Sequence, residues 1–154
     1  MPASDLTLIY GPVASGERRP EERIVPLTAS RPTLAKRRWR GTAGDGREFG
    51  FDLAEGLSHG TAFFREGMTL YVLEQAGEEV LEIPVATVEA AARVAWSLGN
   101  LHFGVQVLPG AVRVTGDPAV LQLLAREKIP FGRVQAVFLP LAAGAAHHHA
   151  HSHG

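Results

Sequence analysis

Short apolar runs separated by polar turns fill the first half of the chain. Turn signals such as Gly11-Pro12 and Asp45-Gly46 divide runs rich in β-branched and aromatic residues, which is typical of short strands. Pro26 favours an edge position for the strand that contains it, because proline cannot donate a ladder hydrogen bond. We expect strands at residues 6–10, 24–27, 36–40, 48–53, 61–64 and 68–74, with residues 31–32 breaking the chain. Residues 1–76 are therefore predicted to be a small all-β domain.

The pattern changes after residue 77, where apolar residues recur at helical spacing. Thr87 is a suitable cap for a helix over residues 87–98, and Asp117 for a second helix with Pro118 in its first turn. Strands are expected at residues 80–85, 103–108, 112–115 and 133–139. The order β-α-β-β-α-β is that of a ferredoxin-like, or split βαβ, domain. We therefore predict an α+β protein, with this second domain at residues 77–140.

The end of the first predicted helix carries the chain's most distinctive histidine. Gly99 and Asn100 are the residue types that accept a left-handed conformation, so they indicate a helix end. His102 lies two residues beyond Asn100 and is the one histidine flanked by apolar residues. A single histidine in such a place is commonly a partly buried residue bonded to backbone. A second feature of the chain favours a metal ligand instead.

That second feature is a histidine-rich tail, predicted to be disordered and to span residues 141–154. An alanine- and leucine-rich linker leads into it, and Ala150 and Ser152 interrupt the histidines. Purification tags are usually uninterrupted, so the interruptions favour a native metal-binding tail, although a tag stays an alternative. The tail supplies five candidate ligands: His147, His148, His149, His151 and His153.

Composition narrows the possible functions. The 154 residues carry a formal net charge of −1, which gives no overall field for nucleic acid or an anionic membrane surface. Cysteine is absent, so disulfides and thiolate metal sites are excluded. No apolar run approaches the ~20 residues of a membrane helix, and the first residues do not resemble a signal peptide. We expect a cytoplasmic protein without nucleic-acid or membrane partners.

A basic cluster at residues 36–40 interrupts this balanced composition. As a strand it places Lys36, Arg38 and Arg40 on one face, with Arg37 and Trp39 on the other. Two interpretations remain open. The cluster is either a solvated strand face or a contact surface for phosphate or an acidic partner.

Several of these segments together resemble the UreE family, the nickel metallochaperones of urease maturation. Residues 98–107, Leu-Gly-Asn-Leu-His-Phe-Gly-Val-Gln-Val, are similar to the family's metal-site segment, and His102 is its motif histidine. The basic strand, the turn at residues 44–47 and the returning strand at 48–53 also match the family's pattern. The resemblance implies a ferredoxin-like second domain and a homodimer that shares Ni(II) between two motif histidines. It also implies partners, namely the urease accessory GTPase UreG and the apo-urease complex.

The chain departs from the family pattern at two auxiliary metal positions. Ser97 stands where some members have a second histidine, and residues 115–118 replace a histidine cluster that others carry. Asp117 is a possible oxygen ligand, but a helix N-cap explains it better. His102 and the tail are then the candidate ligands. Imidazole also accepts Cu(II) and Zn(II), so the choice of nickel comes from the resemblance.

No enzyme signature is present. The chain lacks a nucleophile elbow, a phosphate-binding loop and paired carboxylates beside a histidine, so we expect a non-enzyme. The alternative to a metallochaperone is a non-catalytic interaction module that binds an extended peptide at a sheet edge, with an incidental metal-binding tail.

Overall fold

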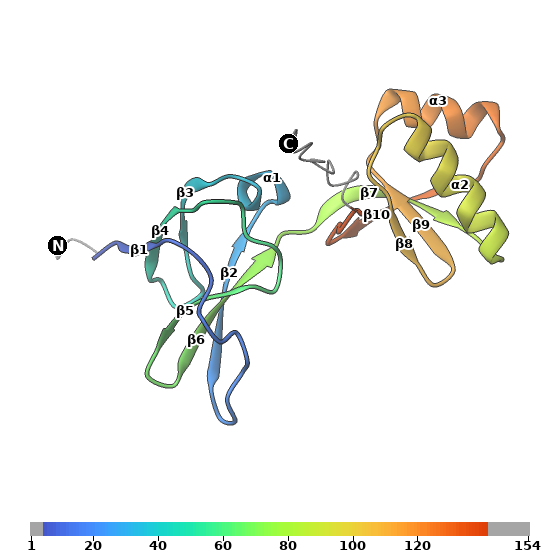
Figure 1. Cartoon of the computed structure of the whole chain (residues 1–154). Coiled ribbons are helices and arrows are strands. Elements are labelled where there is room, and N and C mark those ends of the chain that lie inside the picture. Colours follow the sequence, from blue (N-terminus) through green and yellow to red (C-terminus); the bar gives the residue numbers. More distant parts are fainter. Residues whose placement is uncertain (1–4, 142–154) are drawn as a thin grey trace, which may run out of the picture. The chain divides into compact units, whose positions relative to one another are not determined.

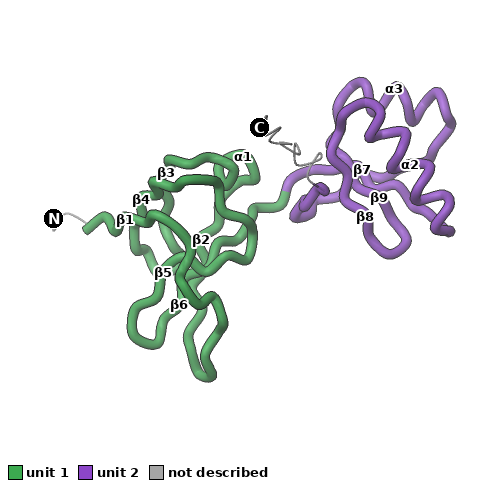
Figure 2. Tube along the Cα trace, viewed as in Figure 1, with its two compact units in different colours: residues 1–77 green, residues 78–154 purple. Residues whose placement is uncertain are grey.

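The computed structural model describes residues 5–141. The chain divides into two compact units, Met1–Gly77 and Glu78–Gly154, shown in different colours in Figure 2. The protein is α+β, as the sequence predicts. No helix in the described part of the chain is long and apolar enough to cross a membrane.

Two three-stranded sheets make up the first unit. One has the order β1-β4-β3 and the other β2-β6-β5 (Figure 1). The pairs β1–β4 and β2–β6 are parallel, whereas β3–β4 and β5–β6 are antiparallel. The six expected strands are all present with slightly shifted bounds: β1 Thr7–Ile9, β2 Arg23–Ala29, β3 Arg38–Thr42, β4 Glu48–Asp52, β5 Ala62–Glu66 and β6 Thr69–Gln75. Pro26 lies in an edge strand, as expected.

Aromatic side chains fill the core of this unit. Phe49 contacts Phe63 edge-to-face with ring centroids 5.0 Å apart, and it also contacts Tyr71. Trp39 stacks on Phe51 at 4.0 Å. Such pairs each contribute about 1 kcal/mol beyond the burial of their area. They fix which face of β3 and β4 points inward, so alternate residues of these strands point outward.

A buried ion pair ties the long loop before β2 to β5. Arg65 Nε donates to Glu22 Oε1 at 2.6 Å, and the Glu22 side chain is fully buried. The guanidinium also donates to the backbone carbonyl oxygens of Ser15 and Glu17. The hydrogen bond from Arg65, aided by one from the Arg19 amide, lowers the pKa of Glu22 although burial opposes this.

One expectation for this unit was incomplete. Residues 31–32 do end the β2 region, but a short helix, α1 Arg31–Leu34, follows at once. The Ser30 hydroxyl accepts a hydrogen bond from the Thr33 amide, and proline lies in the first turn, where its missing N–H costs nothing. Proline therefore begins a helix here as well as ending a strand.

The second unit has the predicted order β-α-β-β-α-β. Its four strands form one antiparallel sheet with the order β10-β7-β9-β8. The elements are β7 Glu78–Pro84, α2 Val88–Asn100, β8 Gln106–Leu108, β9 Ala111–Val114, α3 Pro118–Arg126 and β10 Gly132–Ala136. The strands that were predicted at 103–108 and 133–139 are thus shorter than expected.

Both helices pack on the same face of this sheet (Figure 1). The register pairs Leu81 with Val114 and Ile83 with Val112, so these four side chains share one face. They form a single apolar cluster with helix residues Val94, Leu98, Val120, Leu123 and Leu124. This cluster fixes the position of the end of α2 relative to the sheet.

Candidate metal centre at the end of helix α2

Helix α2 has one buried face and one exposed apolar stripe. Thr87 begins the helix by accepting a hydrogen bond from the Ala90 amide at 3.1 Å, as predicted. Val94 and Leu98 point into the core. On the solvent side, Val88 is 83% exposed and Trp96 is 70% exposed. Large apolar groups left in water on one helix face are typical of an interaction surface.

The helix ends later than predicted. Gly99 and Asn100 remain helical, and His102 is the residue with a left-handed backbone, at φ 63°. The His102 amide donates to the Gly99 carbonyl at 2.9 Å and the Phe103 amide to the Leu98 carbonyl at 3.4 Å. These two bonds form a Schellman closure. The closure favours an apolar residue directly after the left-handed one, and Phe103 packs against the cluster that contains Leu98.

His102 is exposed at this helix end, with its backbone fixed by the closure. The described residues contain no group of three or more histidine, aspartate or glutamate side chains arranged to hold a metal. His59, the other histidine in the described ranges, lies in the first unit, where its Nδ1 accepts a hydrogen bond from the Gln75 amide at 3.0 Å. His59 is exposed in a turn. Among the described residues of the second unit, 78–141, His102 therefore supplies the single imidazole, at the end of α2.

The last described residues run beside the segment that follows His102. The Leu141 amide donates to the Val105 carbonyl at 2.8 Å, and the Leu139 amide donates to Gln106 Oε1 at 3.3 Å. A Cβ on Gly104 would lie 3.0 Å from Pro140 Cβ, so the two segments are in close contact. The last described residue, Leu141, therefore lies next to the segment that follows His102. The predicted tail ligands lie outside the described residues: His147, His148, His149, His151 and His153.

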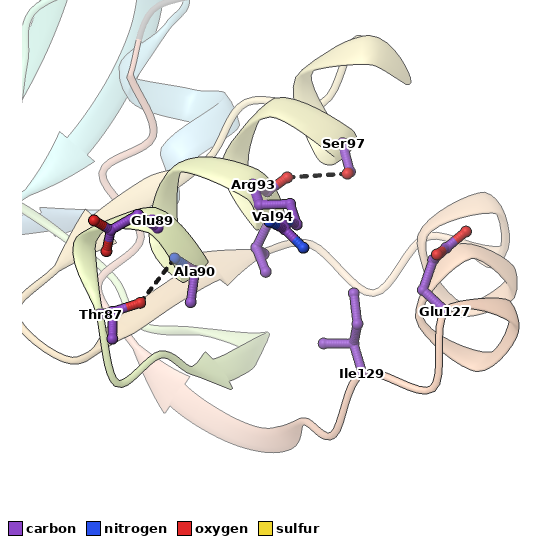
Figure 3. Close-up of a pocket in the computed structure, with 8 residues that line it drawn as sticks. All are labelled: Thr87, Glu89, Ala90, Arg93, Val94, Ser97, Glu127 and Ile129. Atoms are coloured by element: carbon purple, nitrogen blue, oxygen red, sulfur yellow. Dashed lines mark hydrogen bonds between the residues drawn. The ribbon is translucent and has the colours of Figure 1, made fainter.

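A hollow of about 370 Å³ lies between α2 and the end of α3 (Figure 3). Ser97 lines it, together with Arg93, Val94, Glu127 and four other residues. The Ser97 hydroxyl donates to the Arg93 carbonyl at 2.9 Å, so it serves the helix. No histidine lines this hollow, so its walls add no imidazole at the position where the resemblance implies one in some family members.

Two further candidates from the sequence can be placed in the structure. Asp117 caps α3 by accepting a hydrogen bond from the Ala119 amide at 2.9 Å, which agrees with the N-cap interpretation. In the basic cluster, Arg38 and Arg40 are exposed on one face of β3 while Trp39 turns inward. Both positions were predicted from the sequence. The contact of His59 with Gln75 was missed, because it joins a turn residue to the end of a strand 16 residues further along the chain, and no local pattern predicts such a contact.

Comparisons with known proteins agree on one family. Residues 78–154 match the family model for the UreE urease accessory protein, C-terminal domain. A urease accessory protein UreE of Ralstonia nicotianae is 33% identical over 146 residues, covering 92% of this chain and 67% of that protein. UreE of Deinococcus radiodurans is 32% identical over 128 residues, covering 79% of this chain and 83% of that protein. UreE of Cupriavidus pinatubonensis is 29% identical over 150 residues, covering 96% of this chain and 66% of that protein.

Proposed function

The chain belongs to the UreE family of urease accessory proteins, and on that premise we propose that it is a metallochaperone that binds Ni(II) and delivers it to apo-urease. The observation that carries the proposal is the exposed His102 at a helix end that two backbone hydrogen bonds close. A metal carrier must hold its cargo where a recipient can reach it. The proposed role needs no catalysis, and the relatives are accessory proteins by description.

We assign the nickel site to a homodimer. One imidazole cannot fill the coordination shell of a divalent nickel ion, whereas a two-fold axis beside His102 would bring two of them together. The exposed stripe of α2 supports this arrangement, because Val88 and Trp96 lie on the solvent side and Leu101, beside His102, is 38% exposed. Burying these side chains against a second copy would add about 2 kcal/mol for each large apolar group.

We propose further that the tail supplies ligands to the same site. Leu141 is hydrogen-bonded to Val105, so the tail starts near the motif segment. His151 is ten residues beyond Leu141 and has a reach of at most about 35 Å. Tethering of this kind gives effective ligand concentrations in the millimolar range. In this proposal one of His147, His148, His149, His151 or His153 completes the His102 site, and the others bind further metal more weakly.

The proposed partners are the GTPase UreG and the apo-urease accessory complex, and the proposed compartment is the cytoplasm. Cu(II) and Zn(II) would compete for the same imidazoles, because Cu(II) exceeds nickel in intrinsic affinity for such ligands. Ligation requires neutral imidazole, so protons also compete with the metal and nickel affinity should fall as the solution is acidified.

Nickel titration of a chain truncated after Ala146 tests the proposal. We expect one tight nickel ion per dimer by calorimetry, a dimer by analytical ultracentrifugation, and fewer nitrogen ligands by X-ray absorption than in the full chain. His102→Ala in the truncated chain should abolish the site. Tight nickel binding that survives this substitution would reject the assignment of His102. An unchanged nitrogen count after truncation would reject the role of the tail.

A further inference from the structure

The chain after β10 crosses the face of the second sheet that the helices leave free. At one edge of this sheet Ala136, the last residue of β10, pairs with Glu78. Five residues later the Leu141 amide donates to the carbonyl oxygen of Val105, which directly precedes β8 at the opposite edge. The edges are three strand spacings apart, about 14 Å, and five extended residues span at most about 18 Å. We call residues 137–141 the strap.

The strap lies on the side of the sheet away from α2 and α3. Val114 packs under the helices, so Arg113 faces the other way, and Gln106 is in register with Arg113. The Gln106 side chain therefore points toward the strap, where its Oε1 accepts a hydrogen bond from the Leu139 amide at 3.3 Å. Phe138 is only 1% exposed. The strap is thus packed onto the protein and does not extend into solvent.

The strap holds the loop that follows His102. Residues 103–105 belong to no helix or strand, and the two hydrogen bonds from the strap end at Val105 and its neighbour in β8. A Cβ on Gly104 would lie 3.0 Å from Pro140 Cβ, so glycine leaves the room that the strap occupies. On the helix side of the sheet, Phe103 packs against the apolar cluster. The loop is therefore held from both faces of the sheet.

We propose that the strap, through Gln106, positions the His102 imidazole for nickel. The inference rests on the proposed function, in which His102 from each of two chains binds one ion. A loop that was free to move would have to be ordered when the ion binds, and that ordering would weaken affinity. The strap orders the loop beforehand, although none of its atoms is a ligand. Gln106 is thus a positioning residue of the nickel site.

The test uses the full-length chain with its five tail histidines replaced by alanine, which we call the parent. Gln106→Leu removes the acceptor of the Leu139 amide, whereas Gln106→Glu keeps an oxygen at the same place. By calorimetry, the leucine variant should bind nickel about tenfold more weakly than the parent, in the range seen when groups that orient metal ligands are removed. The glutamate variant should lose no more than threefold. Exchange of the Leu139 amide by NMR should become at least fivefold faster in the leucine variant alone.

Gly104→Val disturbs the strap at a second contact. Gly104 has an ordinary backbone conformation, so the added side chain strains no backbone dihedral, and its Cβ meets the rigid ring of Pro140. We expect faster exchange of the Leu141 amide and about tenfold weaker nickel binding. If Gly104→Val does not fold, Gly104→Ala takes its place, because its Cβ makes the same contact.

Two matched substitutions serve as controls. Gly132→Val adds the same side chain in the second unit where nothing lies within 4 Å, and Gln122→Leu changes an exposed glutamine on α3. Both should leave nickel affinity within twofold of the parent. Urea unfolding of every variant checks that the second unit remains folded.

Three results would overturn the inference. One is faster amide exchange in the strap with unchanged nickel affinity, and another is unchanged exchange at Leu139 in Gln106→Leu. The third is a Gln106→Glu variant that binds nickel as weakly as Gln106→Leu does. Failure of the proposed function looks different: the parent then binds no nickel, or binds it equally well after His102→Ala, and either result rejects His102 as the ligand and this inference with it.

Discussion

The backbone amide of Phe103 donates to the carbonyl oxygen of Leu98 at 3.4 Å, and this bond encloses His102 in a left-handed conformation, φ 63°. Helices usually place glycine at this position, because a Cβ there costs on the order of 1 kcal/mol. In this chain the residue at that position is His102, whose imidazole is the proposed nickel ligand.

Glycine at position 102 should relieve that cost. We expect His102→Gly to be more stable than His102→Ala by about 1 kcal/mol, because alanine keeps the unfavourable Cβ and glycine does not. Urea unfolding of the two variants measures the difference. An alanine variant as stable as the glycine variant would show that the closure does not strain residue 102.

Substituting His59 and His102 one at a time should distinguish an effect on stability from an effect on nickel binding. His59→Ala removes the acceptor of the Gln75 amide and should cost about 1 kcal/mol, with nickel binding unchanged. His102→Ala should abolish the tail-independent nickel site and change stability little, because its side chain is exposed. Parallel urea unfolding and calorimetry on chains truncated after Ala146 test both expectations. The assignment fails if His59→Ala lowers nickel stoichiometry.

Substitution of Asp117 should lower the stability of the fold and leave nickel binding unchanged. Replacing it with alanine removes the cap of α3 and should cost about 1 kcal/mol. Asp117→Asn keeps a capping oxygen and is the matched control. If either variant lowers nickel affinity, Asp117 is a ligand after all, and the assignment of metal to histidine alone is incomplete.

Acid should weaken the first unit through Glu22. The hydrogen bond from Arg65 lowers the pKa of Glu22 below its ordinary value near 4.5. The folded state then binds fewer protons than the unfolded state, so this stabilisation is complete above about pH 4.5 and is lost as pH falls through the folded-state pKa. We expect the stability difference between the unsubstituted chain and Glu22→Gln to shrink below that pH. Urea unfolding at several pH values measures it, and a constant difference would contradict the expectation.

The strands and the two longer helices could be predicted because their signals are local. Thr87 and Asp117 cap helices as expected, and alternation located Trp39 on the inner face of β3. The parallel pairings β1–β4 and β2–β6 join segments some 40 residues apart, and no local pattern predicts such partners. The four-residue α1 is too short to show a helical period, so it was not predicted.

The candidate site could be predicted only in part. The sequence located His102 at a helix exit, but it assigned the left-handed conformation to Gly99 and Asn100, whereas His102 adopts it. The choice depends on Phe103, whose side chain must reach the core when the helix closes. The remaining ligands could not be derived, because in the proposed site they come from a second chain or from beyond residue 141.

The charge at the end of α2 has a consequence for metal affinity. Its last turn contains no basic residue, whereas the last turn of α3 contains Arg126. An α-helix carries roughly half a negative elementary charge at its C-terminal end, which cationic side chains commonly offset. At α2 this partial charge is not offset within the helix, so in the proposed site it would attract a divalent ion held by His102. The helix dipole would then add an electrostatic contribution to cation binding that no additional ligand has to supply.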